Sequence, residues 1–65
     1  MSTEIVRLRT EIVGKITDNG GERVARDRDD KIVAKYHKSA NVTREDGREL
    51  GTGDMLRGIL IGRAS

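Results

Sequence analysis

The sequence predicts a mainly β fold: a small antiparallel sheet of about four to five short strands joined by hairpins, with a possible short carboxyl-terminal helix. Three observations support this fold. Apolar and polar residues alternate over several short runs, glycine with asparagine or aspartate separates the runs, and β-branched residues fill much of them. A chain of 65 residues allows one domain, residues 1–65.

Residues 4–17 show the two-residue period of a half-buried strand. One parity is almost entirely apolar and the other is mostly polar. The apolar parity contains Val6, Leu8, Ile12, Gly14 and Ile16. A helix is the alternative, because Ile5, Leu8 and Ile12 also lie at helical spacing. β-branched side chains and Gly14 weaken a helix, so a strand is favoured.

The segment DNGG at residues 18–21 predicts a tight turn. If residues 19–21 form a three-residue loop, Ile16 lies opposite Val24 and the apolar faces of the two strands agree. A two-residue loop would instead place Ile16 opposite Arg23. We therefore expect the three-residue loop.

Two successive strands are expected around the acidic segment at residues 27–30, since Val-Ala-Arg at 24–26 is echoed by Val-Ala-Lys at 33–35. This acidic segment lacks the ladder of ligands that an EF-hand needs, so we expect it to turn the chain and not to hold a cation. The period of the second strand places Ile32, Ala34 and Tyr36 on one face, and Val33, Lys35 and His37 on the other.

A third turn is predicted at Asp46-Gly47, between residues 42–45 and 48–50. As a two-residue hairpin loop it would pair Arg44 with Glu49, which are opposite charges.

The most hydrophobic segment, residues 54–62, follows a glycine hinge at residues 51–53. Asp54 could cap a two-turn helix that ends at Gly62. Alternatively, residues 56–61 could form a final strand with Gly58 as its weak point. The strand is favoured over the helix.

The chain also predicts an intertwined or swapped homodimer. Phe and Trp are absent and Tyr occurs once, so the core is thin for a domain near the lower size limit. Without Cys, no disulfide can compensate. The apolar segment after the hinge is expected to cover the partner's sheet. The expected interface consists of Met55, Leu56, Ile59, Leu60 and Ile61.

The composition argues against several kinds of chemistry. One His and no Cys make a metal site unexpected, and no nucleophile motif or phosphate-binding loop is present. We therefore expect no catalytic residues, no cofactor and no small-molecule substrate. Charged residues interrupt every apolar run near the amino terminus, so no membrane contact is expected and the cytoplasm is the expected location.

The expected function is that of a non-enzymatic interaction or structural module acting as a homodimer. The alternative is a weak nucleic-acid binder without sequence preference. Residues 35–44 combine three cations with the lone aromatic residue, which could stack on a base while the cations contact phosphates. The candidate residues are Lys35, Tyr36, Lys38 and Arg44.

Overall fold

The computed structural model describes residues 2–64, apart from the side chain of residue 64. It confirms a mainly β fold with antiparallel pairing and a short carboxyl-terminal helix, and it contains more strands than expected. The elements in chain order are β1 (Ser2–Leu8), β2 (Glu11–Asp18), β3 (Glu22–Asp27), β4 (Ile32–His37), β5 (Val42–Glu45), β6 (Arg48–Thr52) and α1 (Leu56–Ala64).

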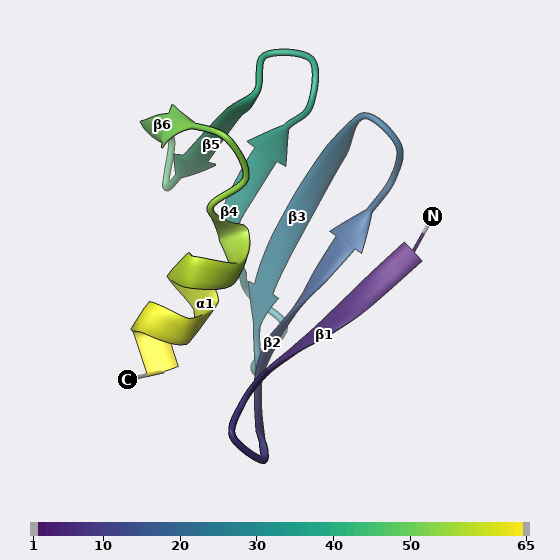
Figure 1. The fold of residues 1–65 in the computed structure, drawn as a ribbon, viewed down its shortest axis with the longest axis vertical. Coiled ribbons are helices and arrows are strands. Elements are labelled where there is room, and N and C mark those ends of the chain that lie inside the picture. Colours follow the sequence, from purple (N-terminus) through teal and green to yellow (C-terminus); the bar gives the residue numbers. More distant parts are fainter. Residues whose placement is uncertain (1, 65) are drawn as a thin grey trace.

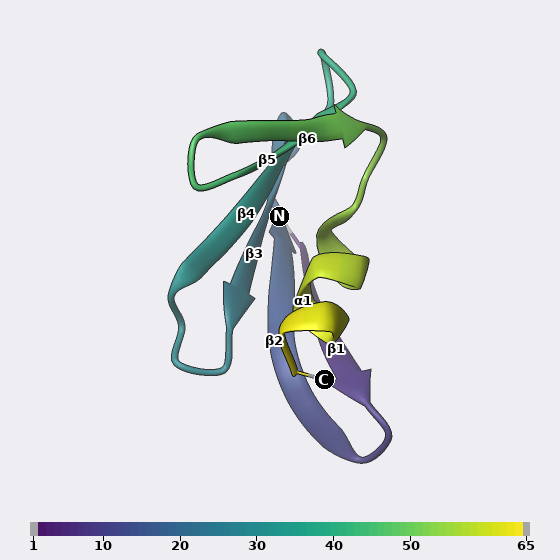
Figure 2. The same cartoon turned by 90° about the vertical axis from the view of Figure 1, so that its left-hand side faces the viewer.

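The six strands form one open sheet in which the spatial order is the sequence order, β1 to β6. Strand β1 is one edge and β6 is the other (Figure 1). The sheet twists strongly, so that β6 lies across the direction of β1 and β2 (Figure 2). Helix α1 returns from β6 and packs on the face formed by β1 to β4.

The single strand expected for residues 4–17 is wrong, because the chain reverses at Arg9 and Thr10 to give β1 and β2. Arg9 adopts a positive φ of 60°, which a non-glycine residue rarely does. The alternation continues through this turn without a Gly, Asn or Asp to mark it, and for that reason the turn was not predicted.

Two β-bulges reverse the expected orientation of several apolar side chains. The pairing shifts between Val6–Gly14 and Arg7–Ile12, which leaves Val13 as an extra residue in β2. Val13 is consequently buried, at 4% exposure. Ile12 was expected on the apolar face, but it is 47% exposed and lies outside the core.

The same device recurs in β4, where Val33 is the extra residue between the pairs Ala25–Ala34 and Arg26–Ile32. Val33 is buried and Ile32 is 51% exposed. Ala34 and Tyr36 do lie on the core side, but Val33 takes the place expected for Ile32.

The register of the first predicted turn differs from expectation, since Ile16 pairs with Ala25 and not with Val24. Asn19 N donates to Glu22 O across Gly20 and Gly21, with an N–O distance of 3.2 Å. Val24 and Ala25 are both buried, so an apolar residue would lie opposite Ile16 in either register. In the structure it is the small Ala25 that faces the helix, as part of the core cluster.

The other two turns form where they were expected. Asp46 and Gly47 both adopt positive φ angles, 53° and 79°, as a two-residue type I′ loop requires, and Arg44 pairs with Glu49. The acidic segment turns the chain, because Asp27 Oδ1 accepts hydrogen bonds from Asp29 N and Lys31 N at 2.9 and 3.0 Å.

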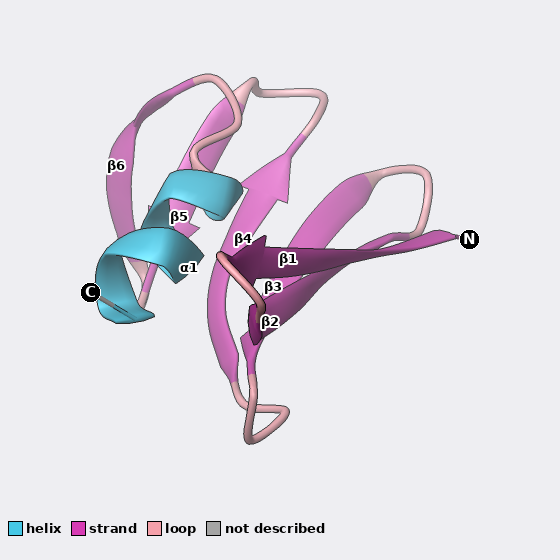
Figure 3. Ribbon diagram, turned by 60° about the horizontal axis from the view of Figure 1, so that its bottom comes forward, coloured by secondary structure: helices cyan, strands magenta, loops and turns pink. Residues whose placement is uncertain are grey.

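Residues 56–61 are helical, so the favoured strand is wrong. Asp54 Oδ1 accepts a hydrogen bond from Leu56 N at 3.0 Å, as a helix cap does. Leu56 and Leu60, one turn apart, are 0% and 1% exposed and pack on the sheet. The helix lies on one side of the sheet (Figure 3), and among residues 2–63 the core is on that side.

Gly14 allows the helix to approach β2 closely. A Cβ atom at this position would lie 2.4 Å from Arg26 O and 2.7 Å from Leu60 Cδ2. No side chain fits in that space without a shift of backbone. The close packing of Leu60 of α1 on β2 therefore depends on this glycine.

Candidate functional site

The face of the sheet turned away from α1, here called the open face, has no cover within the described residues. Side chains alternate between the two faces of a strand, so the pairing registers assign them. This face carries half-exposed isoleucines and at least one cation from each of the strands β1 to β5. Its side chains include Ile5, Arg7, Ile12, Lys15, Val24, Arg26, Ile32, Lys35 and Arg44, and the same registers place Glu22, His37 and Glu49 on this face.

Each of the strands β1 to β5 places one cation on the open face, and together these form the cation row. Its members are Arg7, Lys15, Arg26, Lys35 and Arg44. Lys15 pairs directly with Arg26, and Lys35 pairs directly with Arg44. Adjacent strands lie about 4.8 Å apart, so the row spans about 19 Å measured across the strands. It runs diagonally, because Lys15 pairs with Ile5 and Lys35 pairs with Val24.

Asp30 compensates two of the five cations of this row. Its carboxylate lies 3.0 Å from Lys15 Nζ and 3.9 Å from Arg26 Nε. The hydrogen bond from Lys15 lowers the pKa of Asp30, and the charges of Lys15 and Arg26 act in the same direction. One like-charge pair of the row is thus bridged by an acid.

The other pair, Lys35 and Arg44, has no such acid. Neither side chain has a carboxylate within 4.0 Å among residues 2–63, although Glu49 is the register partner of Arg44. Like charges placed directly opposite each other across a strand pair destabilise a sheet. The mutual repulsion of Lys35 and Arg44 is therefore not relieved by an ion pair.

A shallow hollow of about 280 Å³ lies beside this uncompensated pair. Lys35, His37 and Arg44 line it together with Ile32 and the β5–β6 turn. His37 and Ile32 lie at opposite ends of β4. His37 Nδ1 is 3.4 Å from Glu22 Oε2. The lining of the hollow therefore combines nitrogen donors, aliphatic side chains and one acid, Asp46.

The nucleic-acid patch expected from the sequence is divided between the two faces. Lys35 and Arg44 are brought together, but Tyr36 lies on the helix side, where it packs on the core cluster. Its hydroxyl donates to Asn41 Oδ1 at 2.6 Å. Lys38 is held by both carboxylate oxygens of Asp18 at 2.8 Å. Tyr36 therefore lies on the opposite face of the sheet from Lys35 and Arg44, and a role for these residues in binding nucleic acid stays a prediction.

The acids of the helix side are used in ion pairs that fasten α1 to the sheet. Glu4 of β1 bridges Arg23 of β3 and Arg57 of α1, and Arg23 also contacts the cap residue Asp54. The two acids and two arginines of this network balance each other on the covered side. On the open face the registers place two acids, Glu22 and Glu49, beside the five cations of the row.

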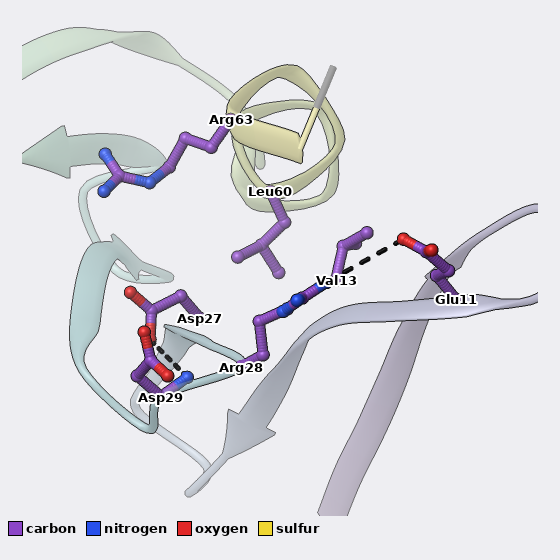
Figure 4. A pocket seen from close by; sticks show the side chains of 7 residues that line it. All are labelled: Glu11, Val13, Asp27, Arg28, Asp29, Leu60 and Arg63. Atoms are coloured by element: carbon purple, nitrogen blue, oxygen red, sulfur yellow. Dashed lines mark hydrogen bonds and ion pairs between the residues drawn. The ribbon is translucent and has the colours of Figure 1, made fainter.

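A second hollow, of about 320 Å³, lies beside the end of α1, on the covered side (Figure 4). Arg28 and Arg63 line it from opposite sides of Leu60. Arg28 lies 3.8 Å from Glu11 Oε2, and Arg63 lies 4.0 Å from Glu45 Oε2. Within the described part of the chain, no three His, Cys, Asp or Glu side chains cluster closely enough to hold a metal ion.

The segment expected to form a dimer interface packs on its own sheet. Leu56 and Leu60 are core residues, Ile59 and Ile61 pack partly buried against them, and Met55 is 42% exposed. The hinge is also fastened, since Thr43 Oγ1 donates to Gly53 O at 2.6 Å and accepts from Met55 N at 3.1 Å. The crossing of this segment to a second chain stays a prediction.

The chain matches no protein-family model, no curated protein and no solved structure closely enough to infer a relationship. Among the described residues, no helix is long and apolar enough to cross a bilayer.

Proposed function

We propose that this protein is a non-enzymatic binding module that contacts the phosphate backbone of a nucleic acid through the cation row on its open face. The observation behind the proposal is the uncompensated pair of Lys35 and Arg44. A sheet that needed only to fold would gain from an acid at either position. A polyanion laid across the row would instead neutralise both side chains.

The distribution of charge supports a long anion over a small one. Net charge is only +2, yet one face gathers a cation from each of five consecutive strands. The row spans about 19 Å across the strands, which alone matches roughly five to six phosphates of one strand of a duplex, at 3.4 Å of axis each. A single small anion would occupy one step of this row.

The absence of aromatic side chains on the open face favours a duplex as the ligand. Proteins that bind single strands stack the bases on aromatic residues. The one Tyr of the chain lies on the helix side. A duplex presents its phosphates and hides its bases, so backbone contacts suffice and no sequence preference is expected.

A short fluorescein-labelled DNA duplex, titrated with the protein and followed by fluorescence anisotropy, tests this proposal. Affinity should fall with salt, with a slope in log K against log salt between about −3 and −5 for three to five phosphate contacts. Replacing the uncompensated pair, Lys35→Gln with Arg44→Gln, should weaken binding and reduce the magnitude of the slope by about two.

The matched control is Arg28→Gln with Arg63→Gln, which removes the same charge from the covered side and should leave the slope unchanged. An equal loss in both double variants would show attraction to net charge alone. No salt-dependent binding by the unmodified protein would contradict the proposal outright.

We also propose that the protein acts as a homodimer in the cytoplasm. A second copy would double the number of cations available to one polyanion, and linked weak sites bind far more tightly than single ones. The lack of Cys suits a reducing compartment, where disulfides do not persist.

A further inference from the structure

The two edges of the sheet differ in how well they are protected against pairing with another strand. Strand β6 has five residues, and its register is interrupted beside the extra residue Leu50. Bulges, short length and charges are the usual means by which natural sheets block edge pairing. Strand β6 therefore resembles a protected edge.

Strand β1 lacks two of these protections, short length and a bulge of its own, and of its two charged residues, Glu4 and Arg7, the first is engaged in ion pairs with Arg23 and Arg57. It is seven residues long and contains no Pro, and the extra residue at its register shift, Val13, belongs to β2. Helix α1 packs on the face of the sheet and β1 stays at its border (Figure 1). The outward backbone groups of β1 thus form a regular, unobstructed edge.

We propose that β1 pairs antiparallel with β1 of a second copy of this chain, about a two-fold axis through Ile5. Two six-stranded sheets then become one continuous sheet. This inference rests on the edge itself and specifies how the proposed homodimer forms, and it does not depend on the proposed binding of nucleic acid.

The sequence of β1 selects this register. Ile5 is the midpoint of Ser2–Leu8, so only the register centred on it pairs the whole strand with itself. Thr3 then lies opposite Arg7 of the second copy, and no two like charges are opposed. A register centred on Glu4 would oppose two carboxylates, and one centred on Arg7 would oppose two guanidinium groups.

The same register provides cover for Ile5. This side chain is 44% exposed at the middle of the edge, and in the dimer it meets Ile5 of the second copy. Opposed residues share a face in an antiparallel pair, so both helices lie on one side and both open faces on the other. The two cation rows then belong to one surface.

Cysteine cross-linking tests the pairing, because the chain has no Cys of its own. Residues opposed across antiparallel strands have Cα atoms about 4.5–5.5 Å apart, within the range that a disulfide spans. Under mild oxidation the Ile5→Cys variant should form a covalent dimer rapidly. The Ile32→Cys variant, an equally exposed position on the same face, should do so far more slowly. Equal rates would overturn the proposed register.

Light scattering after size exclusion tests the assembly without covalent chemistry. The unmodified protein at micromolar concentration should have twice the chain mass of 7.2 kDa. Ile5→Lys should yield a folded monomer, since two ammonium groups would be opposed, and Ile32→Lys should stay dimeric. A monomeric unmodified protein, or a dimer that survives Ile5→Lys, would overturn the inference. The duplex titration reports on the proposed function separately.

Discussion

At the scale of single residues, the structure gives unequal importance to glycines that look alike in the sequence. Gly14 lies in a strand beneath the helix, and a Cβ atom there would collide with backbone and with Leu60. Gly58 lies on the exposed side of α1, with no atom within 4 Å of a Cβ built on it. One position is constrained by packing and the other is not.

The same substitution should therefore have opposite effects at the two positions. Gly14→Ala overpacks the contact between β2 and α1 and should lower the free energy of unfolding by about 1–3 kcal/mol. Gly58→Ala replaces glycine with the best helix former and should raise it by up to about 1 kcal/mol. Urea unfolding followed by circular dichroism measures both, and a neutral Gly14→Ala would contradict the close approach.

Two aspartates make stability depend on acid pH. Hydrogen bonds from Lys38 and from Gly20 N lower the pKa of Asp18, and a hydrogen bond from Lys15 lowers that of Asp30. A carboxyl whose pKa is depressed by folding stabilises the protein above its unfolded pKa and loses that contribution as pH falls through the folded value.

Stability should consequently be flat near neutral pH and should fall below about pH 4. The variant Asp18→Asn with Asp30→Asn should show a smaller fall over that interval, because two of the titrating groups are gone. Thermal unfolding at a series of acid pH values measures this difference. An identical fall in the variant would show that other groups are responsible.

At the scale of elements, the two bulges decide which side chains enter the core. Residues 12–13 and residues 32–33 are both Ile-Val pairs in which the larger isoleucine is exposed and the valine is buried. Hydrophobicity alone would place the isoleucine inside. The extra residue in each strand rotates the valine inward.

Replacing Ile32 or Val33 by threonine should change the free energy of unfolding by different amounts. Val33→Thr puts a hydroxyl into the apolar cluster and should cost about 1–3 kcal/mol of unfolding free energy. Ile32→Thr changes a half-exposed side chain and should stay within about 0.5 kcal/mol. A larger effect of Ile32→Thr, read from urea unfolding, would place the bulge elsewhere.

The elements that the sequence could predict have local chemical signals. Asp46-Gly47 tolerates positive φ angles, and Asp54 can accept a hydrogen bond from the backbone of a helix. The turn at Arg9 and the two bulges have no such signal, because tertiary packing imposes them. A one-residue slip reverses every side chain beyond it, so the unpredicted bulge in β2 misplaced Ile12.

At the scale of the whole molecule, the sheet gathers five cations from separate strands on its open face. Only part of this site could be predicted. Lys35 and Arg44 are close in sequence, so residue spacing found them. Arg7, Lys15 and Arg26 join them only through the register of four strand pairs, which no local pattern specifies.

Asp30 should weaken the binding of a polyanion, because it forms ion pairs with two cations of the row, Lys15 and Arg26. Asp30→Asn should strengthen binding to the DNA duplex and steepen its salt dependence by about one unit for each freed cation. Asp29→Asn, with the same change of charge in the same turn, is the control. An equal gain in affinity in both variants would show an effect of net charge and not of the ion pairs made by Asp30.

The consecutive order of the strands also has a consequence for how the chain folds. Each strand pairs with the strand next to it in sequence, so every pairing closes a short loop and loses little chain entropy, a topology that favours rapid folding. Helix α1 is the exception, since its contact with β1 brings the two ends of the chain together. We expect the hairpins to form before the helix docks. Leu60→Ala should therefore accelerate unfolding while leaving the refolding rate almost unchanged in stopped-flow experiments.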